Sequence, residues 1–341
     1  MVLTDADINP VTRALMYNSK GFEAEAAKIA EHAPPSHITQ GSASALGRAM
    51  RLLSEDTDRK AKHLLHQADF IASKLLGAGG HSDHNNALKT GFDPETESWP
   101  DWIGHVFPEE LLPIPAPVGT ALCHLHPKVA AKLGLPATTR VHAGTTDSIA
   151  AFLASSPVKA GNAVTSIGST LAVKLLSHQR IDAPEVGLYS HRLGDHWLVG
   201  GASNTGGAVL AHFFTPDELE RLTPQIRPDQ PTGLDYYPLI KPGERFPIND
   251  PDLQPRISPR PDDDAVFLQG LLEGIADIEA KCYAEIRARG GDAPGHVYSA
   301  GGAAQNQALL QMRKDRLQLD VSVTDDTEAA IGAAKCALPM R

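Results

Sequence analysis

Two short motifs between His142 and Leu176 contain residue types that phosphate chemistry uses. Asp147 stands at the start of an expected helix, where the positive end of the helix dipole favours a carboxylate. Farther along, the turn Gly168-Ser169-Thr170 separates two expected strands and offers backbone N–H groups and two hydroxyls, which can bind a phosphate. Taken alone, Asp147 is most simply a favourable first-turn charge, and the turn is most simply an ordinary hairpin loop.

A third motif is the double glycine Gly301-Gly302. It lies between an expected strand, His296–Ala300, and an expected helix that begins at Ala304 and contains Asn306. Glycine has no Cβ, so a planar base can approach the backbone closely there. By itself, the pattern most simply indicates a structural turn.

The elements that position the first two motifs can be predicted from the local sequence. Thr145 or Thr146 can cap the helix that contains Asp147. The segments Ala163–Ile167 and Leu171–Leu175 are rich in β-branched and apolar residues, which predicts the two strands of a hairpin.

In this order, the strings GTTDS, SIGST and GGxxxN resemble the carboxy-terminal half of the FGGY carbohydrate kinases, which transfer the γ-phosphate of ATP to a sugar hydroxyl. The resemblance implies that Asp147 is the catalytic base and that Gly168-Ser169-Thr170 binds the ATP phosphates. It implies that Gly301, Gly302 and Asn306 line the adenosine pocket. ATP and Mg²⁺ are the implied cofactors, and a small-molecule sugar is the implied substrate.

The same resemblance implies an α/β fold of the actin-like ATPase, ribonuclease-H-like type. We expect residues 1–137 to be a partial sugar-binding domain with a proline-rich link, and residues 138–341 to be the nucleotide-binding domain. The likeness is strongest to the ribulokinase-like branch, so the expected substrate is a pentulose such as D-ribulose.

Family members begin with a phosphate-binding DxGT turn, and residues 1–60 contain no such string. We therefore expect a truncated first domain. The alternative to an active kinase is a catalytically impaired or inactive homologue that binds nucleotide or sugar.

Several further elements are expected in the first domain. Residues 21–32 and 58–76 have helical patterns, and the second helix closes on a glycine-rich segment. Met16-Tyr17-Asn18 is interpreted as a buried strand end. Asp83 is expected to cap a helix or brace a loop, rather than to bind a metal with His81 and His84. Residues 105–137 are proline-rich and predict a connecting segment with one short helix at Pro127–Leu133.

In the second domain, the string GGASNTGG at Gly200–Gly207 matches neither GxxxxGK[ST] nor GxGxxG, so we interpret it as a closely packed strand turn. Residues 233–261 are expected to be loop-rich. Their Arg245 and Arg256 could contact an anion, although exposed arginines usually do not. Long and short helices are expected at Asp263–Arg289 and Glu328–Ala334.

Composition excludes several classes of protein. The 341 residues carry a formal net charge of −10, which argues against a general nucleic-acid or anionic-membrane binder. Three cysteines lie far apart, which favours reduced thiols over a disulfide framework. The sequence contains neither an apolar run of transmembrane length nor a signal-peptide pattern, so we expect a cytoplasmic protein. The oligomeric state is left open.

Overall fold

The computed structural model describes residues 1–338, which form two compact units. Among the described residues, the first unit contains Met1–Ala150, the short segment His191–Gly194 and residues 332–338; the second contains Ala151–Ser190 and Asp195–Ile331. The predicted division after residue 137 into a sugar-binding and a nucleotide-binding domain assigns functions to the two parts, and it stays a prediction.

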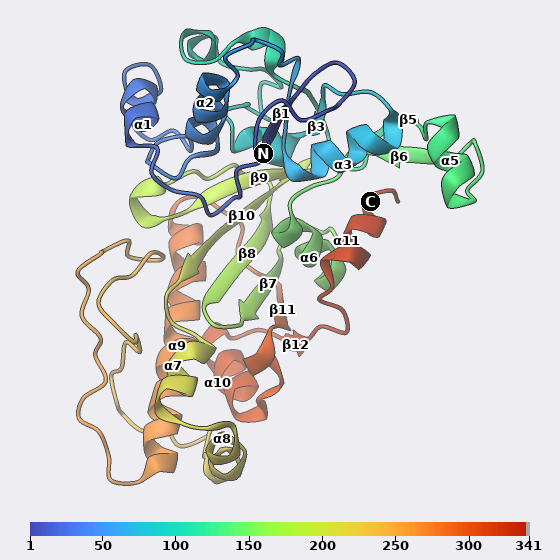
Figure 1. Cartoon of the computed structure of the whole chain (residues 1–341). Helices are drawn as coiled ribbons and strands as arrows, with labels where there is room; N and C mark the ends of the chain where they lie inside the picture. The colour runs from blue at the N-terminus through green and yellow to red at the C-terminus, as the bar shows by residue number, and fades with distance from the viewer. Residues whose placement is uncertain (339–341) are drawn as a thin grey trace. The chain divides into compact units, whose positions relative to one another are not determined.

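A six-stranded sheet dominates the second unit, in the strand order β12-β11-β7-β8-β10-β9 (Figure 1). β7, β8 and β10 are antiparallel neighbours, whereas β11 runs parallel to both β7 and β12. Cα pairing of Ile167 with Leu171 closes the β7–β8 hairpin, which confirms the predicted strand pair. The strands are β7 (Asn162–Ile167), β8 (Leu171–Ser177), β9 (Tyr189–Leu193), β10 (His196–Ser203), β11 (His296–Ala300) and β12 (Val321–Val323).

The long helix α9 (Asp264–Ala288) packs against β8 and β10 and supplies much of the apolar core of this unit (Figure 1). Leu271, Ile275 and Ile278 on this helix are completely buried. The Asp263 carboxylate caps the helix by accepting a hydrogen bond from the Ala265 N–H at 2.8 Å. The predicted long helix is therefore confirmed, and it gives the sheet a rigid backing.

Shorter elements complete the second unit. Residues 233–261, all of which the structure describes, form no helix or extended strand, as predicted. The helix expected from Ala304 begins later, because residues 302–305 form a 3₁₀ turn and Asn306 caps the α-helix that follows. The helices are α7 (Gly207–Phe213), α8 (Pro216–Leu222) and α10 (Gln307–Leu317), with 3₁₀ turns at Pro184–Val186, Thr223–Gln225 and Gly302–Gln305.

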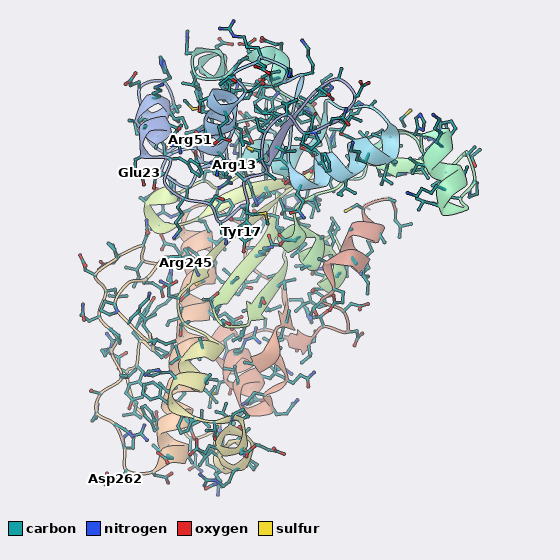
Figure 2. All side chains as sticks on the ribbon, in the orientation of Figure 1. Arg13, Tyr17, Glu23, Arg51, Arg245 and Asp262 are labelled. Atoms are coloured by element: carbon teal, nitrogen blue, oxygen red, sulfur yellow. The ribbon has the colours of Figure 1, made fainter. Side chains whose placement is uncertain are left out.

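The first unit contains three two-stranded sheets and several helices. β1 pairs with β2 and β5 pairs with β6 in antiparallel fashion, whereas β3 and β4 are parallel. Arg51 (labelled in Figure 2) links two of its helices by an ion pair with Glu25 at 2.6 Å. The strands are β1 (Val2–Thr4), β2 (His63–Leu65), β3 (His81–Asp83), β4 (Ile114–Ala116), β5 (Ala121–His124) and β6 (Arg140–His142). The helices are α1 (Glu23–Ala30), α2 (Ala45–Glu55), α3 (Gln67–Leu76), α4 (His84–Leu88) and α5 (Pro127–Leu133), with 3₁₀ turns at Asp101–His105 and Glu109–Leu111.

The prediction of one helix over residues 58–76 is wrong in its first half. His63–Leu65 is strand β2, which pairs with β1, and its Leu64 and Leu65 are completely buried. The helix begins only at Gln67, because His66 and Asp69 form a reciprocal capping box there. Apolar residues that belong to a short buried strand therefore imitated a helical face.

Two other expectations for this unit need correction. Met16 and Tyr17 are 55% and 82% exposed, so Met16-Tyr17-Asn18 is a surface turn rather than a buried strand end. The proline-rich segment 105–137 contains the predicted helix Pro127–Leu133, but it also contributes strands β4 and β5. Pro115 is compatible with β4 because that strand has a single partner, which leaves an unpaired side.

Helix α6 (Asp147–Ser155) follows β6, and the division between the two units falls within it. Its residue Ala150 contacts α11 (Ala329–Lys335) so closely that a Cβ on Gly332 would lie 1.6 Å from the Ala150 carbonyl oxygen. The short helix expected at Glu328–Ala334 is therefore present, and its Gly332 permits this close approach. No helix in the described part of the chain has the length and apolar character needed to cross a membrane.

Candidate functional site

The turn between β7 and β8 is open on its outer side. Gly168 donates its N–H to the Thr170 carbonyl at 3.1 Å, which closes the turn. Ser169 and Thr170 are exposed, and a Cβ on Gly168 would meet no heavy atom within 4 Å. The turn therefore presents backbone and hydroxyl groups to the surroundings, as a phosphate-binding turn must.

The glycine-rich turn after β10 packs against the turn 168–170. Gly207 donates its N–H to the Gly168 carbonyl at 2.8 Å, and Ala208 donates to the Ser169 carbonyl at 3.1 Å. Gly206 has φ +140°, and a Cβ there would lie 2.7 Å from the Thr170 carbonyl carbon. The interpretation of GGASNTGG as a closely packed turn is confirmed, and the surface on which it packs is the turn 168–170.

The buried carboxylate of Glu244 holds that supporting turn in place. It accepts hydrogen bonds from the Ser203 hydroxyl and the Asn204 N–H, both at 2.6 Å, and from the Tyr237 hydroxyl at 2.9 Å. Burial and the charge of Glu244 together raise the pKa of Tyr237 well above its usual range, so Tyr237 stays a donor. Sequence reasoning gave Glu244 no role, because nothing local distinguishes it from Asp235, Asp250 and Asp252 in the same loop.

Arg245, next to Glu244 in the same loop and labelled in Figure 2, contacts the end of β10 through its guanidinium. Its Nε donates to the Asn204 side-chain oxygen at 2.7 Å, and Nη2 donates to the Ser203 carbonyl at 3.3 Å. These contacts tie the loop to the turn 204–207. In this structure the Arg245 guanidinium is therefore bound to Ser203 and Asn204 of the protein itself.

The double-glycine motif contacts the turn 168–170 directly. Gly301 has φ +91°, and a Cβ there would lie 2.6 Å from the carbonyl carbon and oxygen of Ile167. A Cβ on Gly302, by contrast, would meet nothing within 4 Å. Gly301 is thus required for backbone packing, whereas Gly302 keeps an open surface.

Asn306 has a defined structural task. Its side-chain oxygen accepts a hydrogen bond from the Leu309 N–H at 3.0 Å, which caps α10, and its Nδ2 lies 3.4 Å from the Thr223 hydroxyl. The cap fixes where α10 begins relative to the double glycine.

A cavity of about 730 Å³ in the second unit brings these motifs together. Gly168, Ser169, Gly302 and Asn306 are among its lining residues, whereas Thr170 and Gly301 are not. Its other walls are largely apolar. Ile167, Gly207 and Ala303 belong to strings that the sequence analysis singled out, whereas it missed the remaining residues, which come from α7, α8 and a loop without a motif. The additional lining residues are Ile167, Gly207, Ala208, Leu210, Ala211, His212, Leu219, Ile240 and Ala303.

The cavity has the size and character of a small-molecule site. Typical ligand pockets measure about 300–1,000 Å³ and combine apolar walls with a few polar groups. Here the polar lining residues are Ser169, His212 and Asn306, together with the backbone of the turn at Gly168-Ser169. The arrangement can hold an apolar planar group against Gly302 and Ala303 and an anionic group at the turn.

Asp147 lies in the first unit, as the first residue of α6, and its side chain is exposed. Its carboxylate accepts a hydrogen bond from the Ser148 N–H at 2.7 Å. The Thr146 hydroxyl is buried without a hydrogen-bond partner, so the predicted cap by that hydroxyl is not formed. The Thr145 hydroxyl accepts a hydrogen bond from Asn85 Nδ2 at 3.1 Å, which braces the chain just before Asp147.

Behind Asn85 lies a cluster of buried polar side chains. Asp83 caps α4 through the N–H groups of Asn85 and Asn86, at 2.9 and 3.0 Å, which confirms its predicted capping role. Burial raises the pKa of Asp83 to about 6, and the nearby charge of Asp69 adds to the effect. Asp69 itself accepts hydrogen bonds from the His66 ring and the Ser82 hydroxyl. The cluster therefore contains one carboxyl that resists ionisation and another that is fully partnered.

Among the described residues, no group of three or more His, Cys, Asp or Glu side chains could hold a metal ion. Mg²⁺ usually binds through water, substrate phosphates and one or two carboxylates rather than in a cage of protein ligands.

The shifted pKa of Asp83 predicts a pH-dependent stability. Because its pKa of about 6 lies above the ordinary 3.8, the folded state binds this proton more tightly than the unfolded state. The stabilising contribution is full below pH 3.8 and is lost as the pH rises through 6. Asp83→Asn keeps a capping oxygen and removes this titration. In urea unfolding, the variant's stability relative to the parent should rise by about 3 kcal/mol between roughly pH 4 and pH 7. A difference that does not change with pH would contradict the assignment.

Substitution by alanine is expected to change stability at one of the two adjacent glycines and not at the other. Gly301→Ala places a Cβ against the Ile167 backbone at a positive φ, and it should lower the free energy of unfolding by about 1–3 kcal/mol. Gly302→Ala meets open space and serves as the matched control, with an expected change near zero. Urea unfolding of both variants measures the difference, and equal stabilities would show that Gly301 does not pack as described.

Comparison with known proteins gives a consistent family assignment. Residues 163–339, more than half of the chain, match the FGGY family of carbohydrate kinases, C-terminal domain. The chain is 23% identical over 256 residues to the gluconokinase of Bacillus subtilis (strain 168), and 28% identical over 224 residues to the xylulose kinase of the same organism. These matches cover 67% and 62% of this chain but 48% and 44% of the two relatives, so the chain spans about half of their length.

The likeness in three dimensions extends farther along the chain. A xylulose kinase from Rhodospirillum rubrum has a TM-score of 0.84 at 20% sequence identity, covering 98% of this chain and 72% of that protein. The predicted α/β fold of the actin-like ATPase type is therefore confirmed over nearly the whole chain.

Proposed function

Because the chain belongs to the FGGY family of carbohydrate kinases, we propose that it transfers the γ-phosphoryl group of ATP to a hydroxyl group of a sugar. One observation carries the proposal. The predicted phosphate turn and the predicted adenosine motif, which are far apart in the sequence, line the same cavity of the second unit.

The cavity supports specific roles in nucleotide binding. The N–H groups and hydroxyls of the turn Gly168-Ser169-Thr170 bind the phosphates, because the outer side of that turn is open. The adenine ring lies against Gly302 and Ala303, where the missing Cβ of Gly302 leaves room for a planar group. Gly301 and Asn306 shape this wall through backbone packing and the cap of α10.

Asp147 acts as the general base in the proposed reaction. Its exposed carboxylate accepts the proton of the sugar hydroxyl as the hydroxyl oxygen attacks the γ-phosphorus. The bond from that phosphorus to the oxygen that bridges to the β-phosphate breaks, and ADP leaves with the electron pair. Mg²⁺, when bound with the nucleotide, neutralises charge on the phosphates. The Asn85–Thr145 hydrogen bond orients the segment that carries the base.

We propose a pentulose such as D-ribulose as the acceptor, on the resemblance to the ribulokinase-like branch. One relative is named for gluconate and another for xylulose, which is itself a pentulose. Comparing D-ribulose, D-xylulose and D-gluconate in one coupled assay for ADP release distinguishes these acceptors. The pentulose proposal expects a larger kcat/KM for D-ribulose or D-xylulose than for D-gluconate, and a preference for gluconate would contradict it.

Nucleotide binding by the cavity is testable without turnover. Isothermal calorimetry should detect binding of ADP with Mg²⁺, and Gly302→Trp should abolish it, because the indole fills the space beside the predicted base site. Gln305→Trp is a matched control, since Gln305 is exposed in the same 3₁₀ turn and does not line the cavity. Equal ADP binding by both variants, or none by the parent at millimolar ligand, contradicts the nucleotide site.

The base assignment is testable in the same preparation. Asp147→Asn should lower kcat about 10²–10⁴-fold, the usual worth of a general base, with ADP affinity and unfolding unchanged. Glu23→Gln is the matched control, because it removes an exposed first-turn carboxylate from α1 in the same unit. Full activity of Asp147→Asn would remove Asp147 from the reaction. Nucleotide binding without any sugar phosphorylation by the parent would favour a binding role over the proposed kinase activity.

A further inference from the structure

The second unit contains an ion pair that is entirely removed from solvent. Arg313 on α10 and Glu279 on α9 both have side chains that are 0% exposed. Arg313 Nε donates to one carboxylate oxygen at 2.6 Å, and Nη2 donates to the other at 2.8 Å. Two parallel bonds of this kind fix the relative orientation of the two groups as well as their separation.

Three further side chains extend this ion pair into the sheet. The Thr165 hydroxyl on β7 bonds to the Glu279 carboxylate and lies 2.8 Å from the Tyr283 hydroxyl. On β11, the Ser299 hydroxyl accepts a hydrogen bond from Arg313 Nη1. We call these five residues the buried polar cluster; it joins two strands to two helices.

The position of the cluster connects it to the cavity. Thr165 and Ser299 are directly opposite each other in the parallel β7–β11 pair. Thr165 lies on β7, which leads into Gly168, and Ser299 lies on β11, which leads into Gly302. Each of the two residues therefore comes shortly before a motif that lines the cavity. Arg313 lies on the helix that Asn306 caps. No residue of the cluster is among those that line the cavity, so any effect on a ligand must act through these elements.

Stability alone is a poor reason for such an arrangement. The desolvation of two buried charges offsets most of their attraction, and replacing a buried ion pair by apolar residues of similar volume is often neutral or stabilising. What an apolar pair lacks is directional bonding that selects one relative placement of the four elements. In a nucleotide site, that placement sets how the phosphate turn faces the base-binding turn.

We propose that Arg313 and Glu279 are positioning residues for the nucleotide cavity, and that they hold the turn 168–170 and the motif 301–306 at the separation a nucleotide requires. This inference rests on the proposed function. Arg313 and Glu279 do not touch the ligand in this proposal. They affect its binding through their contacts to Thr165 and Ser299.

The test separates affinity from stability. The double variant Glu279→Leu/Arg313→Met keeps the core filled and removes the directional bonds. Its urea midpoint should equal or exceed that of the parent. Its ADP affinity, measured by calorimetry in the full chain with Mg²⁺, should fall about tenfold, the lower end of the effect of groups that orient the ligands of metal sites.

The surface of the same two helices offers a matched control. Arg316 on α10 pairs with Asp277 on α9 at 2.6 Å, and both side chains are more than a third exposed. The control variant Asp277→Asn/Arg316→Gln loses an ion pair between α9 and α10 without altering the buried polar cluster. It should bind ADP as the parent does.

The outcomes are distinct. Parent-like ADP affinity in the folded double variant overturns the inference, as does an equal loss in the control variant. If the double variant does not fold, Ser299→Ala decides, because it keeps the ion pair and removes the hydrogen bond between Arg313 and β11. Weaker ADP binding with an unchanged urea midpoint supports the inference, and unchanged binding overturns it. Absence of ADP binding by the parent contradicts the proposed function itself.

Discussion

Close packing of backbone against backbone around one hairpin turn is the constraint on which the second unit depends. The turn 168–170 is contacted from one side by Gly206 and Gly207 and from another by Gly301, and none of the three positions leaves room for a Cβ. Hydrogen bonds from the N–H groups of Gly207 and Ala208 to this turn fix its carbonyls. These contacts leave Ser169 and Thr170 exposed, so the outer face of the turn stays open.

That arrangement explains why three glycine-rich strings recur in one domain without forming a phosphate loop of a known pattern. Gly206, Gly207 and Gly301 let chain segments meet, whereas Gly168 and Gly302 keep open space at the cavity. Directional polar contacts then hold the segments that the glycines bring together. Glu244 anchors the turn after β10, and Arg313 with Glu279 connects β7 and β11 through α9 and α10. Rigid positioning of donors before the ligand arrives is what phosphoryl transfer demands, because little covalent chemistry is left to the protein.

The sequence predicted elements well where one segment carried its own signal. The β7–β8 hairpin, the long helix α9 and the short helix α5 have clear patterning or capping, and the structure contains all three. Prediction failed where long-range contacts decide the outcome. Leu64 and Leu65 look helical locally, yet pairing with β1 makes them a strand. Asn306 was predicted inside a helix and instead caps it, because the chain leaves the double glycine in a 3₁₀ turn.

For the candidate site, the motifs could be found but their surroundings could not. The apolar walls from α7 and α8, and the buried polar cluster, join residues that are distant in sequence and have no short motif. A crystal structure of the full chain with ADP and Mg²⁺ tests the central claim most directly. The account predicts phosphate oxygens within hydrogen-bond distance of the turn 168–170 and the adenine ring against Gly302 and Ala303. A nucleotide bound elsewhere, with this cavity empty, would contradict it.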